Sequence, residues 1–247
     1  KEEQSITKNG TTKIDSLNEE ITYNISYTAK IIDYEGNATV KLVDTLPYAL
    51  DTNLTNITED LDGGTYDETS KTITWEERVE DIQFTEEKEV TLNKTIKVVY
   101  KDVRQDTVNI NNVITGYIEY ETPDRTSDEI TANWITTTEF TVNIPVTKVW
   151  DDKENSSHRP ESVTVQLTAE GENVEGKTAV LNNNNEWKTT FEDLPKYDDV
   201  GKEINYSVVE RETNSGELEY YDTAKVENVG GIVSVTNSYK ETDSNID

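Results

Sequence analysis

The sequence predicts an all-β protein made of two tandem β-sandwich domains. Threonine, valine, isoleucine and 13 tyrosines are dense along the 247 residues, and apolar residues alternate with polar ones over short runs. A period of two is typical of strands that bury one face, and no long run shows the periodicity of an amphipathic helix. Clusters rich in Gly, Asn, Asp and Pro separate the runs, as the turns of antiparallel sheets do.

The first half contains six predicted strands, and four further strand segments follow Ile144. The six strands are residues 20–32, 38–47, 71–79, 90–103, 106–121 and 129–136. The four later segments are "SVTVQLTAEG", "KTAVLNNNNEWKTTF", "EINYSVVERE" and "GGIVSVTNSY". This number of short strands indicates two immunoglobulin-like β-sandwich domains, at residues 1–139 and 140–247. The β-branched segment "TTTEFTVNIPV" between them predicts a short, stiff joint, and the polar tail "ETDSNID" is expected to fray.

Composition excludes several classes of function. The net charge of −28 opposes binding to nucleic acid or to anionic membrane surfaces. The chain has no cysteine, so disulfides, thiolate metal sites and thiol nucleophiles are excluded. No apolar run is long enough to span a bilayer, so we expect no membrane insertion, and we expect the chain to be a piece of a longer protein. The only histidine, His158, lies in a polar loop without a nucleophile beside it, and "DLDGGT" has Gly64 where a calcium loop needs a ligand. We therefore expect no cofactor and no metal site.

Three polar residues in the second half occupy positions where the alternation predicts buried apolar side chains. In "IPVTKVWDD", Lys148 shares a face with Ile144, Val146 and Trp150. Glu210 in "EINYSVVERE" and Asn237 in "GGIVSVTNSY" interrupt apolar faces in the same way. Each residue alone also fits a strand end or the rim of a sheet, where long polar side chains reach water.

A lysine, a carboxylic acid and an asparagine buried together permit amide formation. Burial lowers the pKa of an amine and raises that of a carboxyl group, so both groups can be neutral at once. A neutral amine is a nucleophile, and a protonated acid can polarise the amide carbonyl and pass a proton to the leaving ammonia. Packing supplies the effective concentration that free solution lacks. The product would be an isopeptide bond between Lys148 Nζ and Asn237 Cγ.

The motifs around these residues resemble a known family. "VTKVWDD", the "W.TTF.DLP.Y" segment at residues 187–197, "INYSVVERE" and "VTNSY" occur in order and resemble the Cna protein B-type domain of Gram-positive surface proteins. The resemblance covers about residues 144–240. It implies an intramolecular isopeptide bond between the first and last strands, joining Lys148 to Asn237 with assistance from Glu210.

The same test applied to the first half identifies a second set of residues. Asp44 interrupts the apolar face of "ATVKLVDTLP", and Asn112 interrupts that of "DTVNINNVITG". The amine is either Lys8, which is in register with Ile6, or Lys13, which is out of register; Lys8 is preferred.

The motifs of the first half also resemble a known type of domain. "ITKNG", "EITYNISYTA", "VKLVDTLPYALD" and "INNVITG" are similar to segments of the isopeptide-forming Cna A-like domains of fimbrial and adhesin stalk proteins, over about residues 5–136. This resemblance implies a bond from Lys8 to Asn112 with Asp44 as the catalytic acid.

The sequence therefore predicts a structural stalk segment of a cell-wall-anchored adhesin or pilin on the outside of a Gram-positive cell. Its partners would be the flanking domains of the same surface protein and a host matrix ligand. It is not an enzyme, because each bond forms once and autocatalytically. The alternative hypothesis is a ligand-binding adhesin region that recognises host matrix protein or carbohydrate. A binding module is expected to gather exposed aromatic side chains in one cluster, whereas the tyrosines here are spread among the strands.

Overall fold

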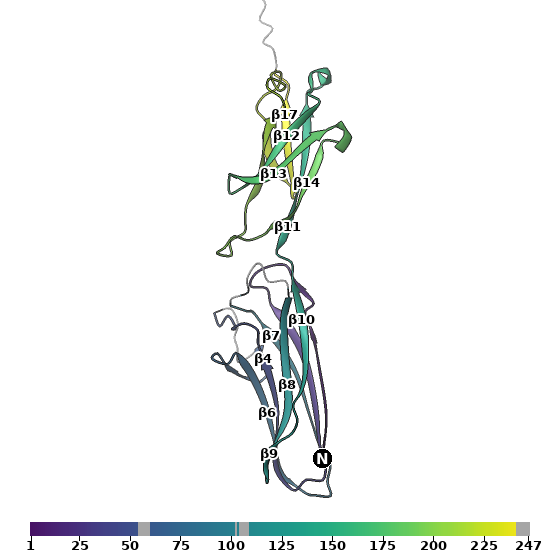
Figure 1. The fold of residues 1–247 in the computed structure, drawn as a ribbon, viewed down its shortest axis with the longest axis vertical. Helices are drawn as coiled ribbons and strands as arrows, with labels where there is room; N and C mark the ends of the chain where they lie inside the picture. The colour runs from purple at the N-terminus through teal and green to yellow at the C-terminus, as the bar shows by residue number, and fades with distance from the viewer. Residues whose placement is uncertain (54–59, 102, 104–108, 241–247) are drawn as a thin grey trace, which may run out of the picture. The chain divides into compact units, whose positions relative to one another are not determined.

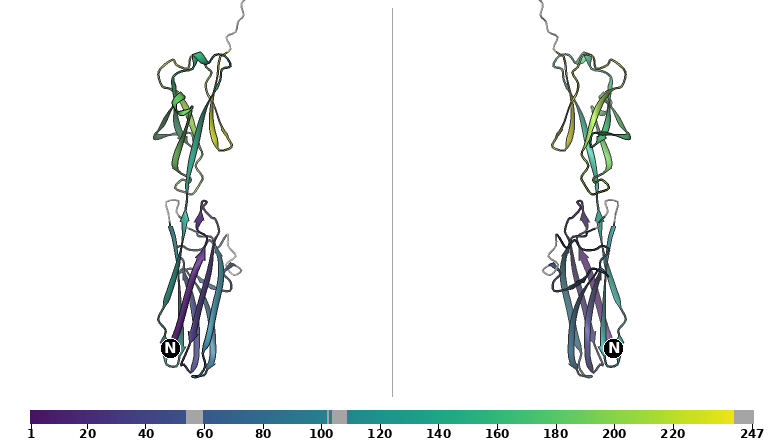
Figure 2. Two further views of the ribbon diagram at one scale, coloured as in Figure 1. Left: turned by 90° about the vertical axis from the view of Figure 1, so that its right-hand side faces the viewer. Right: turned by 90° about the vertical axis from the view of Figure 1, so that its left-hand side faces the viewer.

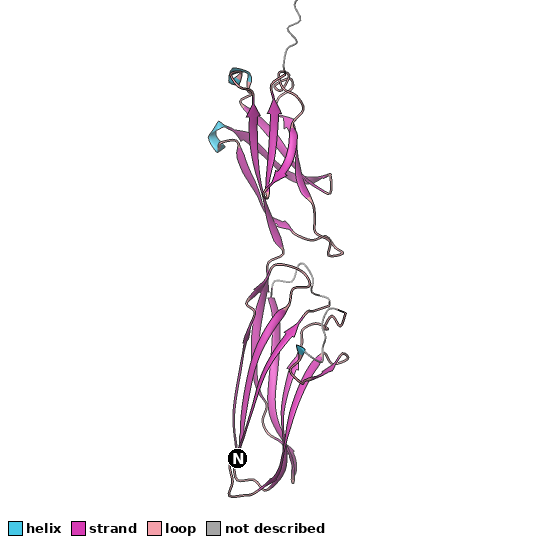
Figure 3. Cartoon of the chain, turned by 180° about the vertical axis from the view of Figure 1, so that it is seen from behind, coloured by secondary structure: helices cyan, strands magenta, loops and turns pink. Residues whose placement is uncertain are grey.

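The computed structural model describes residues 1–53, 60–101, 103 and 109–240. The chain divides into two compact units, Lys1–Phe140 and Thr141–Asp247. Strands account for nearly all of the regular structure in both units (Figure 3), and the all-β prediction is confirmed. No helix among the described residues is long and apolar enough to cross a lipid bilayer.

The first unit is a sandwich of two sheets whose strands run along its length (Figures 1 and 2). The smaller sheet has the order β1-β3-β7, with β1 at Glu2–Gly10, β3 at Ile21–Ile31 and β7 at Lys88–Val98. The larger sheet has the order β2-β10-β8-β4-β6-β5, and β9 pairs with β8. Its strands are β2 Lys13–Ile14, β4 Gly36–Thr45, β5 Thr65–Asp67, β6 Thr72–Ile82, β8 Asn109–Glu121, β9 Asp124–Thr126 and β10 Ile130–Thr138.

Alternating burial builds the core of this unit. Every second residue of β3 from Ile21 to Ile31 is buried, and the same holds for β8 from Ile110 to Tyr120. Gly116 of β8 faces Tyr27 of β3, and a Cβ on this glycine would lie 2.5 Å from the tyrosine ring. The two sheets therefore approach closely here because one strand lacks a side chain at the point of contact.

The strands of the first unit differ from the predicted ones mainly at their ends. The strand predicted at residues 90–103 ends at Val98, and the first three residues of the one predicted at 106–121 lie outside the described residues. β1, which carries Lys8, is nine residues long. Gly10 allows this strand to pair with β3, because a Cβ there would collide with the carbonyl oxygen of Thr22.

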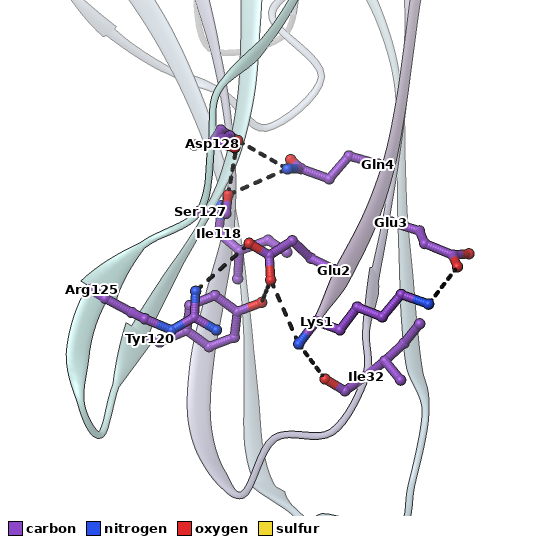
Figure 4. A network of polar contacts seen from close by, with 10 residues as sticks. All are labelled: Lys1, Glu2, Glu3, Gln4, Ile32, Ile118, Tyr120, Arg125, Ser127 and Asp128. Atoms are coloured by element: carbon purple, nitrogen blue, oxygen red, sulfur yellow. Dashed lines mark hydrogen bonds and ion pairs between the residues drawn. The ribbon is translucent and has the colours of Figure 1, made fainter.

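A polar network fastens the beginning of β1 to the other sheet of the first unit (Figure 4). Gln4 Nε2 donates to the carbonyl oxygen of Asp128 at 2.9 Å, and Glu2 pairs with Arg125 of β9 at 3.7 Å. The Arg125 guanidinium also stacks over the ring of Tyr120. These contacts hold the edge strand that carries Lys8 against the facing sheet.

The second unit has two sheets of four and three strands. The first has the order β14-β11-β17-β16, with β11 at Thr141–Asp151, β14 at Lys188–Pro195, β16 at Lys225–Val229 and β17 at Ile232–Ser238. The second has the order β13-β12-β15, with β12 at Ser162–Ala169, β13 at Glu172–Asn182 and β15 at Tyr206–Glu212. The 3-10 helices are η1 at Ser156–His158 and η2 at Asn183–Asn185.

The first and last strands of this unit are neighbours. β11 pairs with β17 in parallel, whereas the other pairings in the two sheets are antiparallel. The core between the sheets is apolar and mainly aliphatic, with Val146, Val165, Leu167, Val208 and Val235 among its buried members. Polar side chains that enter this core are therefore surrounded by groups that cannot solvate a charge.

Candidate functional site

Three polar side chains meet in the core of the first unit. Lys8 comes from β1, Asp44 from β4 and Asn112 from β8. The side chains of Lys8 and Asp44 have no exposed surface, and Asn112 is fully buried. Lys8 Nζ donates a hydrogen bond to Asp44 Oδ2 at 2.6 Å and also contacts Asn112 Oδ1. The amine therefore touches both the acid and the amide oxygen.

Strand geometry explains why these three residues point inward. Asp44 follows the buried residues Val40 and Leu42 at alternate positions of β4, and Asn112 lies between the buried Ile110 and Ile114 of β8. β4 and β8 are neighbours in the larger sheet, whereas β1 belongs to the smaller one. The lysine thus reaches the acid and the amide across the interior of the sandwich.

Burial shifts the two titratable groups of this site in opposite directions. Loss of solvent lowers the pKa of Lys8 from its usual value, although the neighbouring Asp44 opposes the shift. Loss of solvent raises the pKa of Asp44, with the Lys8 ammonium opposing that shift. Asp44 Oδ1 is buried without a hydrogen-bond partner among the described residues. An uncompensated oxygen destabilises the carboxylate form, so the site favours a neutral amine beside a protonated acid.

The alternative amine of the first unit lies elsewhere. Lys13 is on β2, where its side chain is 51% exposed and forms an ion pair with Glu139. Of the two candidate lysines, Lys8 is the one that lies beside Asp44 and Asn112.

A corresponding set of side chains lies in the second unit. Lys148 is on β11, Glu210 on β15 and Asn237 on β17. The Lys148 side chain has no exposed surface, that of Glu210 is 5% exposed, and Asn237 is 1% exposed. Lys148 Nζ lies 3.7 Å from Glu210 Oε1.

The parallel pairing of β11 with β17 brings the amine and the amide together. Lys148 is aligned with Val235, and Asn237 is aligned with Trp150, so the lysine and the asparagine are diagonal neighbours on one face. Diagonal neighbours in a sheet lie within reach of long side chains. In the structure Lys148 Nζ donates to the carbonyl oxygen of Val149 at 2.9 Å and lies 3.6 Å from the centre of the Trp150 ring.

The electrostatics of the second set repeat those of the first. Burial lowers the pKa of Lys148 to about 8, and burial raises the pKa of Glu210. Glu210 Oε1 and Asn237 Oδ1 are both buried without a hydrogen-bond partner among the described residues. One hydrogen bond from a protonated Glu210 to the amide oxygen would satisfy both atoms. Asn237 Nδ2 already donates to the carbonyl oxygen of Asp222 at 3.0 Å.

A cavity of about 460 Å³ opens beside the second set. Glu210 and Asn237 line it together with Tyr221, Asp222 and Val226. It lies between β15 and β16, which are edge strands of their two sheets. A small molecule released at Asn237 therefore has a path out of the core.

Other polar residues of the second unit are engaged in structural contacts. Asp152 is buried and accepts two hydrogen bonds from Arg159, at 2.6 and 2.8 Å, and one from Tyr221 at 3.1 Å. His158 is exposed and packs against the ring of Tyr220. Among the described residues, no group of three or more His, Cys, Asp or Glu side chains could hold a metal ion. Glu59, at the start of the acidic turn "EDLDGG", lies outside them.

The polar side chains that sequence reasoning missed are two tyrosines of the first unit. Tyr100 Oη lies 3.3 Å from Asn112 Nδ2, and Tyr23 Oη lies 3.1 Å from Tyr100 Oη. The Tyr23 ring also packs against Lys8 Nζ, at 4.4 Å. Alternation within residues 20–32 places Tyr23 on the same inward face as Ile21 and Ile25, which was the available signal.

Comparison with known proteins addresses the second unit most directly. Residues 144–238 match the family model of the Cna protein B-type domain. The second unit contains a Cna B-type domain. The curated collagen adhesin of Staphylococcus aureus is 48% identical over 82 residues, which is 32% of this chain and 7% of that protein. The chain thus matches only a small part of the length of this relative.

Solved structures of bacterial surface proteins align with this chain. An adhesin from Mobiluncus mulieris that contains intramolecular disulfide, isopeptide and ester cross-links aligns over 96% of this chain and 99% of its own, with 13% identity and a TM-score of 0.50. The pilus backbone protein of Streptococcus pneumoniae aligns over 96% of this chain and 56% of its own, with 15% identity and a TM-score of 0.31. At such identity the likeness to the adhesin concerns the β-sandwich fold alone, and the Cna B-type assignment rests on the family match.

Proposed function

We propose that this chain is a stalk segment of a Gram-positive surface adhesin or pilin, and that each unit closes one intramolecular isopeptide bond. The observation that carries the proposal is the burial of an amine, a carboxylic acid and an amide together in both units. Lys8, Asp44 and Asn112 form the first set, and Lys148, Glu210 and Asn237 the second. We further propose that the first unit is a Cna A-like domain.

The reaction is the same in both sets. The neutral lysine Nζ attacks the asparagine Cγ, a new C–N bond forms, and the bond from Cγ to Nδ2 breaks. The acid donates its proton to the amide oxygen as the amine attacks, and it then carries the proton lost by the amine to the departing nitrogen. As the carbonyl re-forms, the oxygen gives its proton back to the carboxylate. One ammonia leaves for each bond, and the acid returns to its initial state. Since the product consumes the nucleophile, each site turns over once, and the protein is not an enzyme.

The structure supports this chemistry with proximity and with suppressed charge. In the first unit the amine already contacts the amide oxygen, and the acid holds the amine at 2.6 Å. In the second unit the pKa of Lys148, lowered to about 8, leaves an appreciable neutral fraction near pH 7. The cavity beside Asn237 gives its ammonia a way out.

The two bonds would load the units differently under tension. In the second unit the bond would link adjacent parallel strands, the first and the last, so that pulling on the ends loads the bond directly. In the first unit Asn112 lies on β8, and β9 and β10 follow it, so that bond would join the two sheets rather than the first and last strands. Most of each unit would nevertheless lie outside the load path, as an extracellular rod under shear requires.

The proposed setting is the outer surface of the cell wall. Flanking domains of the same surface protein are the first expected partners. A host matrix ligand is the second, and its support is that the curated relative is a collagen adhesin. The ligand-binding alternative gains no further support from the contacts of the two polar sets, because both are buried.

Intact mass measurement tests the proposal. The parent protein should weigh less than its sequence by two ammonias, and Lys8→Ala or Lys148→Ala should each leave a deficit of one. Lys13→Ala is the matched control, because this lysine is exposed and paired with Glu139, and it should retain the full deficit. A parent protein with no deficit would refute the proposal, and a single missing ammonia would restrict it to the unit whose lysine variant restores the full mass.

A further inference from the structure

A chain of buried hydroxyl groups leads away from the amide of the first unit. Asn112 Nδ2 lies 3.3 Å from Tyr100 Oη, which lies 3.1 Å from Tyr23 Oη. Lys8 Nζ contacts the other end of the same amide, Asn112 Oδ1. Tyr100 is 3% exposed and Tyr23 is fully buried, so both hydroxyls lie in the dry core.

The contacts on the two sides of the Asn112 amide agree on its orientation. Its nitrogen donates to Tyr100 Oη, and its oxygen contacts the Lys8 amine. Tyr100 can accept this bond while it directs its own hydrogen at Tyr23. Burial raises the pKa of Tyr23 to about 12 and that of Tyr100 well above its usual value, so both hydroxyls stay protonated.

With its hydrogen directed at Tyr23, Tyr100 presents a lone pair to the amide, so the nitrogen of Asn112 faces Tyr100 and its oxygen faces Lys8. A flipped amide would set its oxygen against a Tyr100 lone pair and its NH₂ group against the amine. Both contacts would lose a hydrogen bond in a dry core, which is unfavourable.

We propose that Tyr100, held in place by Tyr23, is a positioning residue that orients the Asn112 amide for isopeptide formation and accepts a hydrogen bond from the nitrogen that leaves. This inference rests on the proposed function of the first unit. The carbonyl group is thereby presented to the Lys8 amine, and the departing nitrogen lies toward Tyr100. No proton is transferred through the chain, because every hydroxyl in it keeps its own hydrogen.

The second unit achieves the same orientation without side chains. Asn237 Nδ2 donates directly to the carbonyl oxygen of Asp222 at 3.0 Å. In both units the amide N–H thus has a fixed acceptor, a backbone carbonyl in one and a tyrosine hydroxyl in the other. The hydroxyl chain can be removed by substitution, whereas the backbone carbonyl cannot.

The test follows bond formation in the first unit alone. All variants are made in the Lys148→Ala background, so that any ammonia lost is lost at Asn112. The chains are made by cell-free synthesis, and intact mass is followed over time at a fixed pH. The variants are Tyr100→Phe, Tyr23→Phe and the double substitution. The matched control is Tyr27→Phe, which removes a different buried hydroxyl, one that donates to Gln4 at 2.6 Å.

Tyr100→Phe should slow the loss of ammonia by about tenfold or more, because the amide loses the partner that fixes its orientation. Tyr23→Phe should slow it less, and in the double variant it should add nothing, because Tyr23 acts only through Tyr100. Tyr27→Phe should react at the parent rate.

Two results would overturn the inference while leaving the proposed function in place. One is that Tyr100→Phe and Tyr27→Phe react equally fast. The other is that the double variant is slowed by the product of the factors measured for Tyr100→Phe and Tyr23→Phe alone. Independent effects of this kind would show that the hydroxyls act only by stabilising the core. A Lys148→Ala protein that never loses ammonia would instead refute the proposed function of the first unit, and the inference would fall with it.

Discussion

The length of chain that tension can release gives a direct mechanical prediction. Lys148 and Asn237 are 89 positions apart (237 − 148), and Lys8 and Asn112 are 104 positions apart. Once each pair is bonded, the residues between them cannot extend when the ends of the protein are pulled. Lys148→Ala removes the amine of the second unit and returns those residues to the load path.

The expected change follows from the reach of an extended chain. At roughly 3.3 to 3.6 Å per residue, the second unit of Lys148→Ala should release about 300 Å more than that of the parent protein. Lys8→Ala should release about 350 Å more from the first unit by the same reasoning. Each bond should also remove about 4 to 5 kcal/mol of loop entropy from the unfolded chain, so the variants should unfold at lower denaturant concentrations.

Single-molecule pulling between the two termini measures these lengths. Lys13→Ala provides the control, because it removes a lysine that lies outside both buried sets. A parent protein whose units extend as fully as those of the two variants would show that no bond limits them. An additional release that does not scale with the separation of the paired residues would show that the bonds join other positions.

Three further predictions concern the packing and charge of the two units. In Asn237→Ala no bond can form, so Lys148 keeps its free amine. Between the folded-state Lys148 pKa of about 8 and the usual 10.5, the unfolded chain binds more protons than the folded one, so the free energy of unfolding should rise with pH across that window. Urea denaturation at several pH values measures this rise, and Lys148→Met should abolish it. Gly116→Ala should lower the free energy of unfolding by about 1 to 3 kcal/mol, because its Cβ would lie 2.5 Å from the Tyr27 ring; an unchanged melting curve would show that the sheets can separate at no cost. Arg159→Ala should lower the free energy of unfolding by about 2 kcal/mol at neutral pH, because it removes the cation that pairs with the buried Asp152 carboxylate. As the pH falls below the usual carboxyl pKa of 3.8, the parent protein loses the same stabilisation, so the difference between parent and variant measured by denaturation should shrink.

Most of what could be predicted from the sequence came from the alternation of apolar and polar residues along the strands. A strand packed on one face must place every second side chain in the core, so a polar residue in the apolar register is buried whatever the topology. This is why Asp44, Asn112 and Lys148 could be named before any strand order was known. The same reasoning separated Lys8 from Lys13, because these two positions have opposite parity.

Alternation could not show which strands lie side by side. The parallel pairing of β11 with β17 depends on contacts between distant segments, and nothing local in "VTKVWDD" or "VTNSY" encodes it. The placement of Asn112 on β8, before the last strand of its unit, depends on topology in the same way. Tyr100 was missed for a related reason: it lies just beyond the end of β7 and joins Asn112 only through the folded core.

The energetics of an unreacted site argue that its residues are present for their chemistry. A buried amine and acid are stripped of solvent, and replacing such a pair by apolar residues of similar size is often neutral or stabilising. A sandwich core has no structural need for Lys8 and Asp44 where neighbouring positions hold Val40 and Ile114. Amide formation removes this disadvantage, because the ionisable amine becomes a neutral amide nitrogen and the remaining acid can stay protonated. The proposed reaction would thus turn an unfavourable buried pair in each core into a covalent link, and two units with different strand pairings would share it for that reason.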